Sequence, residues 1–403
     1  MTDPAADPLA WVGDELDRLD REGLRRPTRI CRTLPGGRVE MDGRELWNFG
    51  SNDYLGLASE ALVTQRLRGA SALPHGATAS PAVVGRSPEI AELERTIAEF
   101  EGTEDAVVFP TGYAANLGTV SALTGPGDAV FVERDCHACL VDGAKLGGGR
   151  LRVWRRDDPE RLERSLAKER DARRRWILTE QVFSMDGDGY YRLRSVLVAA
   201  RKAGAVVICD AAHATGIYPR QSWQTTSLEK IWRFPHERLV LTGTLSKAVG
   251  AAGGFVAASK VVCDYLRHAA KSHIFSTALP PAVAATATAN LLRIQSDPTL
   301  GERVRRSARF LSRRLTHADL PVSGSGESPI LPVILNQPDA AVRASERLAD
   351  AGFFVPAIRP PTVRRGTSRL RISLSAAHPH EAVDGLADAL IALFSSSPET
   401  SAA

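Results

Sequence analysis

The feature that most constrains this fold is the alternation of short apolar strands with helices between residues 88 and 210. A predicted helix over 88–101 precedes an apolar run, and the same order then recurs along the chain. The predicted strands are 106–109, 129–132, 151–154, 176–179 and 205–209, and the later helices lie at 111–116 and onward, 138–146, 159–171 and 193–203. Strands that are apolar throughout are buried on both faces by helices. The sequence therefore predicts an α/β fold with a mostly parallel sheet.

Two different regions flank this alternating segment. Leu9, Val12, Leu16 and Leu19 recur at helical spacing, which predicts an amphipathic helix over about 9–24, followed by a small irregular arm. After 280–281 the pattern changes to two long helices and then to a smaller α+β region. We expect an N-terminal helix and arm (1–50), a large domain (51–281), a smaller C-terminal α+β domain (282–395) and a loose tail (396–403).

Composition and charge are those of an ordinary globular enzyme. Of the 403 residues, 43% are hydrophobic and 24% are charged, which excludes a disordered or fibrous chain. The net charge of +4 is too small and scattered to predict nucleic-acid binding, and no apolar run reaches the length of a membrane span. Five cysteines do not form the pattern of a disulfide framework. Because no signal-peptide pattern is visible, we expect a cytoplasmic protein.

Lys247 lies in an unusual setting for a charged side chain. Small and hydroxylated residues surround it over 241–255, and apolar runs lie on both sides, at 238–241 and 255–258. Burial lowers the pKa of a lysine, which leaves a free amine that can form a Schiff base with an aldehyde. A surface lysine in a glycine-rich loop is the alternative, and this stretch alone does not decide between the two.

Polar residues that follow the predicted strands are the candidates for a site, because ligands of open α/β sheets gather at the carboxyl ends of the strands. They are Thr111, Gly112, Tyr113, His137, Glu180, Ser184, Asp210, His213, Thr244 and Lys247. Gly112 and Tyr113 begin a helix, where free N–H groups and the helix dipole favour a phosphate, and Thr244 would add a hydroxyl donor. A plain helix cap is the alternative for this turn. Together the set describes a site for a phosphorylated pyridine aldehyde.

Asp210 follows directly after an apolar strand, where an ionised carboxylate is costly without a cationic partner. A protonated pyridine nitrogen would be such a partner, and holding its proton keeps the ring an electron sink. His213 would hydrogen-bond the phenolic oxygen of the same ring. The alternatives are an aspartate that caps the next helix, the stronger interpretation for Asp210 by itself, and an ordinary packed histidine.

The segment from Cys136 to Cys139 is a C-x-x-C motif after a strand. Such a motif also occurs in redox pairs and in halves of zinc sites. The sequence has no second pair at matching spacing, so no metal is expected, while a redox pair stays open as the alternative. We favour His137, between the two cysteines, as the functional member, because its flat ring can stack on a cofactor.

With these segments assembled, the sequence closely resembles the α-oxoamine synthases, pyridoxal-phosphate (PLP) enzymes of the fold-type I aminotransferase architecture. The similarity extends over about residues 9–395. The stretches that carry it are 51–57, 111–116, 179–188, 210–213, 243–247 and 275–281. Within the family, the segments 357–363 and 368–378 are most similar to the biotin-pathway member that joins L-alanine to a pimeloyl thioester.

The resemblance implies which residues bind PLP within the large domain. They are Gly112, Tyr113, His137, Ser184, Asp210, His213, Thr244, Lys247 and, across the interface of a homodimer, Thr277. Among them Lys247 would be the Schiff-base lysine, and His137 would stack on the ring and steady a developing oxyanion. Asp210 and His213 would hold the ring nitrogen and the phenolic oxygen.

The resemblance also implies a substrate side. Arg371 and Asn52 would hold the carboxylate of the amino acid, and Arg25, Arg359 and Thr362 would meet the acyl substrate. The expected reaction is a decarboxylative condensation of an amino acid, L-alanine by resemblance, with an acyl thioester on coenzyme A or on an acyl carrier protein. The products would be an α-aminoketone, CO2 and a free thiol.

Other functions stay open from the sequence. The nearest is the same chemistry on another substrate pair, in a secondary-metabolite pathway. Others are a plain fold-type I aminotransferase or lyase and a non-catalytic regulator. Three segments depart from the family pattern around the substrate channel, namely 76–85, 190–191 and 217–223, and they bear on the acyl donor more than on the reaction.

Overall fold

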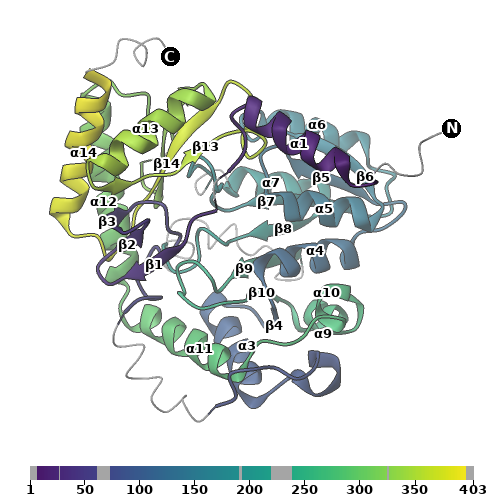
Figure 1. Cartoon of the computed structure of the whole chain (residues 1–403). Coiled ribbons are helices and arrows are strands. Elements are labelled where there is room, and N and C mark those ends of the chain that lie inside the picture. The colour runs from purple at the N-terminus through teal and green to yellow at the C-terminus, as the bar shows by residue number, and fades with distance from the viewer. Residues whose placement is uncertain are drawn as a thin grey trace.

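The computed structural model describes residues 7–26, 28–60, 73–189, 193–218, 238–324 and 326–395. Its centre is a seven-stranded sheet in the order β4-β10-β9-β8-β7-β5-β6 (Figure 1). The strands are β4 (Asp105–Phe109), β5 (Ala129–Glu133), β6 (Arg150–Trp154), β7 (Arg175–Glu180), β8 (Val206–Asp210), β9 (Leu239–Thr244) and β10 (Gly254–Ala258). β10 is antiparallel to β4 and β9, and the other pairings are parallel. The predicted α/β fold with a mostly parallel sheet is confirmed.

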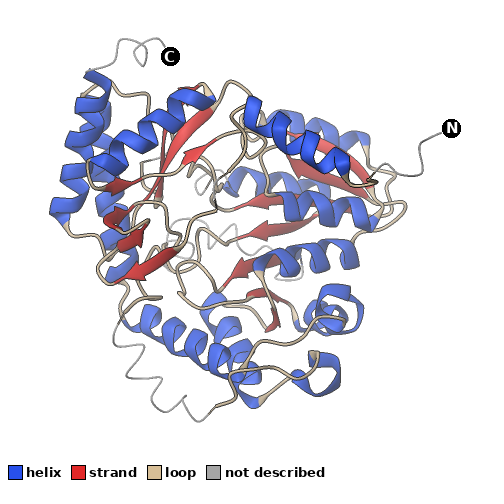
Figure 2. Ribbon diagram, in the orientation of Figure 1, coloured by secondary structure: helices blue, strands red, loops and turns tan. Residues whose placement is uncertain are grey.

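Helices cover both faces of this sheet (Figure 2). The helices are α3 (Pro88–Glu101), α4 (Gly112–Leu123), α5 (Ala138–Gly147), α6 (Pro159–Lys168), α7 (Leu193–Ala203), α9 (Lys260–Ala269), α10 (Lys271–Ile274) and α11 (Pro281–Ser296). Apolar side chains of α4, α5 and α9 belong to one buried cluster, and those of α3, α6, α7 and α11 belong to another. The strands contribute alternate side chains to the two clusters, as strands buried on both faces must.

One predicted helix is shorter than expected. The sequence predicts a helix over 159–171, but α6 ends at Lys168. Glu169 turns away from the helix and accepts hydrogen bonds from Arg150 at 2.9 Å and from Arg152 at 2.8 Å, both on β6. The pairing of this carboxylate with two arginines of the neighbouring strand replaces the last helical turn.

The C-terminal region is built on a three-stranded sheet in the order β11-β14-β13. Its elements are β11 (Ile330–Asn336), β13 (Ala357–Ile358), β14 (Ser368–Ser373), α12 (Thr299–His317), α13 (Pro338–Asp350) and α14 (His380–Ser395). Leu315, Ile330, Leu370 and Leu386 belong to the same buried cluster as α3 and α7. One continuous core therefore connects this region to the large sheet, and the proposed division at residues 50, 281 and 395 stays a prediction.

The N-terminal arm is more regular than the sequence indicates. The amphipathic helix is α1 (Ala10–Arg21), and β1 (Cys31–Leu34), β2 (Arg38–Met41) and β3 (Arg44–Asn48) follow it. β12 (Phe353–Phe354) pairs with β3 in parallel. This pairing joins the arm to the C-terminal region, which no local pattern in the sequence predicts.

Some sequence features lie outside the described residues: the tail 396–403, residues 190–191, and 219–223 of the segment 217–223. The departing segment 76–85 is described, and it ends in a short π-helical turn, Pro81–Gly85. Within the described ranges, no helix has the length and apolarity to cross a membrane.

Candidate active site

The candidate site lies at the carboxyl ends of adjacent parallel strands. β7 ends at Glu180 and β8 ends at Asp210, and these two residues are register partners. β9 ends at Thr244 and leads within three residues to Lys247. Because these strands are neighbours, the side chains at their ends converge on one edge of the sheet, where the sequence predicts the site.

Lys247 pairs with a histidine in the folded chain. Its Nζ lies 2.8 Å from Nε2 of His213, and Nδ1 of His213 lies 2.6 Å from the hydroxyl of Tyr54. Burial lowers the pKa of Lys247, although Asp210 and Glu180 act in the opposite direction. Burial also lowers the pKa of His213 well below its usual value. The imidazole is therefore neutral at pH 7, and the lysine is closer to its free-amine form than an exposed lysine is.

Arg371 is oriented by acceptors on three different segments. Nε donates to the carbonyl of Ser184 at 2.5 Å, and Nη1 donates to the hydroxyl of Ser373 at 2.8 Å. Nη1 and Nη2 both donate to Oδ1 of Asn52 at 3.2 Å, and Nη2 also donates to the Tyr54 hydroxyl at 3.2 Å. Two N–H groups that share one oxygen form the fork that also fits a carboxylate. The structure thus brings the predicted pair Arg371 and Asn52 together, and Tyr54 connects them to His213 and Lys247.

Asp210 is a buried carboxylate held by neutral donors. Its side chain accepts from Nδ2 of Asn116 at 2.7 Å and from the amide of Ala212 at 2.8 Å. The Thr242 hydroxyl donates to Oδ1 of Asn116 at 2.6 Å and so fixes which amide atom faces Asp210. Both of these donors, the Asn116 amide and the Ala212 backbone N–H, are uncharged. The bond to Ala212 shows that Asp210 also caps its turn, so the alternative from the sequence is true as well.

This arrangement fits PLP. A buried carboxylate with neutral partners suits a protonated pyridine nitrogen, because the charge is oriented but not compensated. A partly buried amine with a lowered pKa suits the aldehyde. The residues that would hold these two ends, Asp210 and Lys247, lie at the end of β8 and in the turn after β9, and the charge of Asp210 raises the pKa of Lys247 against the effect of burial.

The predicted phosphate end lies at the start of α4. The Thr111 side chain accepts from the amide of Ala114 at 3.0 Å, so the predicted cap is present. The amides of Gly112 and Tyr113 have no acceptor within the helix because they belong to its first turn. A Cβ atom on Gly112 would lie 3.0 Å from Cβ of Thr244, so glycine allows this close approach without displacing Thr244. The helix start and Thr244 are therefore adjacent, and their phosphate role stays a prediction.

His137 caps α5, and its backbone is fixed by Glu180. The amide of His137 donates to Oε1 of Glu180 at 2.5 Å, and burial lowers the pKa of the imidazole. The ring of Tyr113 meets the ring of His137 edge-on, with centroids 6.3 Å apart. Burial raises the pKa of the thiols of Cys136 and Cys139. Because protonated thiols are poor nucleophiles and poor metal ligands, this geometry does not favour a redox pair, and the described residues hold no cluster of three metal-binding side chains.

The predicted acyl-side residues lie together but apart from this network. Arg359 donates to the carbonyl oxygens of Gly23 and Arg25, the latter at 3.5 Å. Arg25 itself pairs with Asp20 at 2.6 Å, and Arg26, which the sequence analysis does not name, donates to the Thr362 hydroxyl at 3.0 Å. Thr277 is exposed, and its proposed contact across a dimer stays a prediction.

The sequence did not indicate three residues whose hydrogen bonds orient the site: Tyr54, Asn116 and Ser373. Tyr54 is fully buried and Asn116 is 2% exposed. Each lies inside a stretch that carries the family resemblance. A polar side chain among apolar residues in such a stretch was the signal that could have indicated them. The partners His213 of Tyr54 and Asp210 of Asn116 are 159 and 94 residues away, too distant for that signal to name them.

Glu180 gives a pH-dependent prediction. Burial, with Asp210 nearby, raises its pKa to about 8, so the folded protein keeps a proton that the unfolded chain loses above pH of about 4.5. Because of this carboxyl, the free energy of unfolding of the parent protein falls as pH rises from about 5 to about 8. We expect the free energy of unfolding of Glu180→Gln, relative to the parent, to rise over that range by up to about 1.4 kcal/mol per pH unit.

Urea unfolding of the cofactor-free protein at several pH values measures this difference. Glutamine keeps an oxygen that accepts from the amide of His137, so the turn retains its contact. Glu160→Gln is the control because Glu160 is 84% exposed. The prediction is contradicted if the free energy of unfolding of Glu180→Gln, relative to the parent, stays level or falls as pH rises.

Comparisons with known proteins agree with this geometry. A family model described as aminotransferase class I and II matches residues 44–390. An 8-amino-7-oxononanoate synthase of Maricaulis maris is 43% identical over 97% of both chains, and one of Methylococcus capsulatus is 43% identical over 90% of this chain and 92% of its own. A solved serine palmitoyltransferase of Sphingomonas wittichii has a TM-score of 0.87 and 28% identity, with 97% of this chain and 99% of its own covered. The chain therefore belongs to the aminotransferase class I and II family and, within it, to the PLP-dependent α-oxoamine synthases.

Proposed function

We propose that the protein condenses L-alanine with a pimeloyl thioester, releasing CO2 and a thiol and giving the α-aminoketone 8-amino-7-oxononanoate for biotin synthesis. The observation that carries the proposal is the continuous contact from Lys247 through His213 and Tyr54 to Arg371. It places an amine that can move a proton close to a guanidinium that can hold a carboxylate. The relatives named above supply the choice of substrates.

The residues of the chain divide the work of this reaction. PLP, when bound, supplies an aldehyde and an electron-accepting ring. Asp210 would hold the proton on the ring nitrogen, and the amine of Lys247 would take the α-proton of the amino acid. Arg371 binds the amino acid carboxylate in place of the Asn52 oxygen that its two Nη groups now share. The imidazole of His137 would stack on the ring and stabilise negative charge on the thioester oxygen.

His213 can assist in either of two tautomers. The Tyr54 hydroxyl has one hydrogen to donate, and both Asn52 Oδ1 at 3.0 Å and His213 Nδ1 at 2.6 Å are within reach. When Tyr54 donates to Asn52, Nδ1–H of His213 donates to Tyr54 and Nε2 accepts from Lys247. When Tyr54 donates to His213, Nε2–H faces the site and can donate to the phenolic oxygen of the cofactor.

We also place the enzyme in the cytoplasm as a homodimer with its site near the subunit interface. Phe275 is 78% exposed, and Val83 and Val84 are each 74% exposed. The backbone bond from Ala278 to Ala79 at 3.0 Å ties the segment after α10 to the 76–85 turn. Apolar side chains on two joined segments support an interface there. The acyl group can arrive on either coenzyme A or an acyl carrier protein.

The test is thiol release by the purified PLP-loaded protein. With L-alanine and pimeloyl-CoA or the pimeloyl carrier protein, we expect thiol, CO2 and the aminoketone in equal amounts, and no thiol without the amino acid. The competing pairs are glycine with the same pimeloyl thioesters and L-serine with palmitoyl-CoA. The second pair is included because serine palmitoyltransferases are structural neighbours. Faster turnover of a competing pair overturns the substrate assignment, and absence of thiol release with every pair overturns the proposed reaction.

A further inference from the structure

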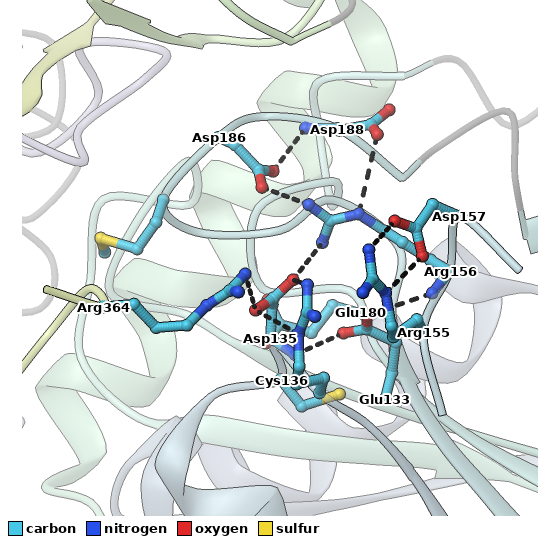
Figure 3. Close-up of polar contacts among 12 residues, drawn as sticks. Glu133, Asp135, Cys136, Arg155, Arg156, Asp157, Glu180, Asp186, Asp188 and Arg364 are labelled. Atoms are coloured by element: carbon cyan, nitrogen blue, oxygen red, sulfur yellow. Dashed lines mark hydrogen bonds and ion pairs between the residues drawn. The ribbon is translucent and has the colours of Figure 1, made fainter. Parts of the chain in front are cut away.

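The turns that follow three neighbouring strands meet at Arg156, which belongs to one of them. β7, β5 and β6 are adjacent in the large sheet, so the turns at their carboxyl ends lie side by side. The turn after β5 contains Asp135 and His137, the turn after β7 contains Asp186 and Asp188, and the turn after β6 contains Arg156. Figure 3 shows the guanidinium of Arg156 between the carboxylates of the other two turns.

Arg156 contacts a carboxylate on each side. Nη2 donates to Oδ2 of Asp186, Nε lies 3.7 Å from Oδ2 of Asp188, and Nη1 lies 3.9 Å from Oδ2 of Asp135. Its Cζ lies 4.1 Å from the ring centroid of Phe183, and its side chain is only 14% exposed. A planar guanidinium directs donors to several acceptors at once, whereas the compact ammonium of lysine acts as a point charge.

The contacts on one side lead to His137. Glu133 accepts from the amide of Asp135 at 2.7 Å and from the amide of Arg156 at 3.3 Å, so one carboxylate connects the turns after β5 and β6. The amide of His137 is in turn held by Glu180 at 2.5 Å. The backbone that carries the imidazole is thus anchored at Asp135 and at its own amide.

The contacts on the other side lead to Arg371. The amide of Phe183 donates to the carbonyl of Asp188 at 2.8 Å, and the amide of Gly187 donates to the carbonyl of Phe183 at 2.9 Å, which closes the turn. The carbonyl of Ser184, inside this turn, accepts from Nε of Arg371 at 2.5 Å. Arg156 therefore hydrogen-bonds to the turn that orients Arg371 through Asp186 and lies within ion-pair range of Asp135 on the turn that carries His137.

We propose that Arg156 is a positioning residue that fixes the distance between His137 and the carboxylate-binding Arg371. The proposal rests on the proposed roles of these two residues in the α-oxoamine synthase reaction. Asp135 also pairs with Arg134 and Arg364, each at 3.3 Å, but neither arginine has an ion pair with Asp186 or Asp188 among the described residues, so Arg156 is the cation that connects the two turns. Without a planar guanidinium between them the turns lose the group that sets their spacing, so His137 and Arg371 no longer meet the same bound substrate in register.

The test compares three variants of the PLP-loaded protein. Arg156→Lys keeps the charge and loses the fork, Arg156→Gln loses both, and Arg155→Gln is the matched control. Arg155 is the adjacent residue, is 47% exposed, and forms its ion pair with Asp157 of the same turn, which is 51% exposed. The measurements are kcat and KM for L-alanine, the visible circular dichroism of bound PLP, and the melting temperature.

We expect Arg156→Gln to lower kcat/KM by about 10²-fold, since a misplacement of about 1 Å has that effect, and Arg156→Lys to lower it by about 10-fold. The dichroism of bound PLP should change in the direction seen for His137→Ala, while Arg155→Gln keeps the parent values. Wild-type kcat and dichroism in Arg156→Lys overturn the proposal. So does an equal loss in Arg155→Gln, or a loss that follows melting temperature while the dichroism of the folded protein is unchanged.

Two further comparisons give a result even if a variant does not fold or the parent protein is inactive. If Arg156→Gln does not fold, Arg156→Lys decides, because its retained charge still balances the carboxylates. If the parent protein releases no thiol with any substrate pair, the proposed function fails, and the dichroism comparison still reports whether Arg156 places His137 against the cofactor.

Discussion

Lys247→Ala is expected to lose at least about 10³-fold in the exchange of the L-alanine α-proton with solvent, a step that needs no acyl donor. Lys247 is half-buried with its Nζ beside a neutral imidazole at 2.8 Å, and its lowered pKa makes it the available base. Alanine removes the amine and leaves the contact of His213 with Tyr54 in place. The exchange rate is measured by NMR in deuterated buffer.

The same variant has a second readout that is independent of turnover. Reduction with borohydride should attach PLP covalently at position 247 in the parent, located by peptide mass spectrometry, and not in Lys247→Ala. The control is Lys260→Ala, whose side chain is 69% exposed and pairs with Asp264 on the surface. Parent-like exchange in Lys247→Ala, or a PLP label on a different residue of the parent, contradicts the role given to this lysine.

The strands of the large sheet could be predicted because local composition determines them. Each run such as 205–209 is apolar enough to require cover on both faces, so strand type and approximate bounds follow from the sequence alone. The predicted edge of the sheet for the site followed from the same pattern. Short strands such as β12 and β13, of two residues each, have no such pattern, since partners distant in sequence decide their pairing.

The site could be predicted only as a set of residue types at strand ends. That Lys247, His137 and Asp210 approach one another follows from strand order, whereas the contacts between them depend on long-range packing. Tyr54 and His213 are 159 residues apart, and Arg371 and Asn52 are 319 apart. Arg156 illustrates the limit, because in the sequence it is one of two adjacent arginines, and only its burial between three carboxylates distinguishes it from Arg155.

Asp210→Asn is expected to lower the rate of α-proton exchange and of thiol release by about 10²-fold or more at saturating PLP. The carboxylate is 6% exposed and oriented by Asn116 and Ala212. A neutral amide of the same shape keeps an acceptor for one of these donors, but it cannot hold the proton on a pyridine nitrogen. Affinity for PLP should fall as well, because the buried ion pair with the ring is lost.

Asn116→Ala and Asp264→Asn separate the charge of Asp210 from its orientation. Asn116 acts on the cofactor only through Asp210, so its removal should cost about 10-fold, less than the loss of the charge itself. Asp264 is 48% exposed and should have no effect on either rate. If Asp210→Asn kept the parent exchange rate with PLP fully bound, the ring nitrogen would not need this carboxylate, and the buried charge at the end of β8 would be a turn cap alone. If Asn116→Ala were more damaging than Asp210→Asn, the amide and not the carboxylate would be the group that the cofactor depends on.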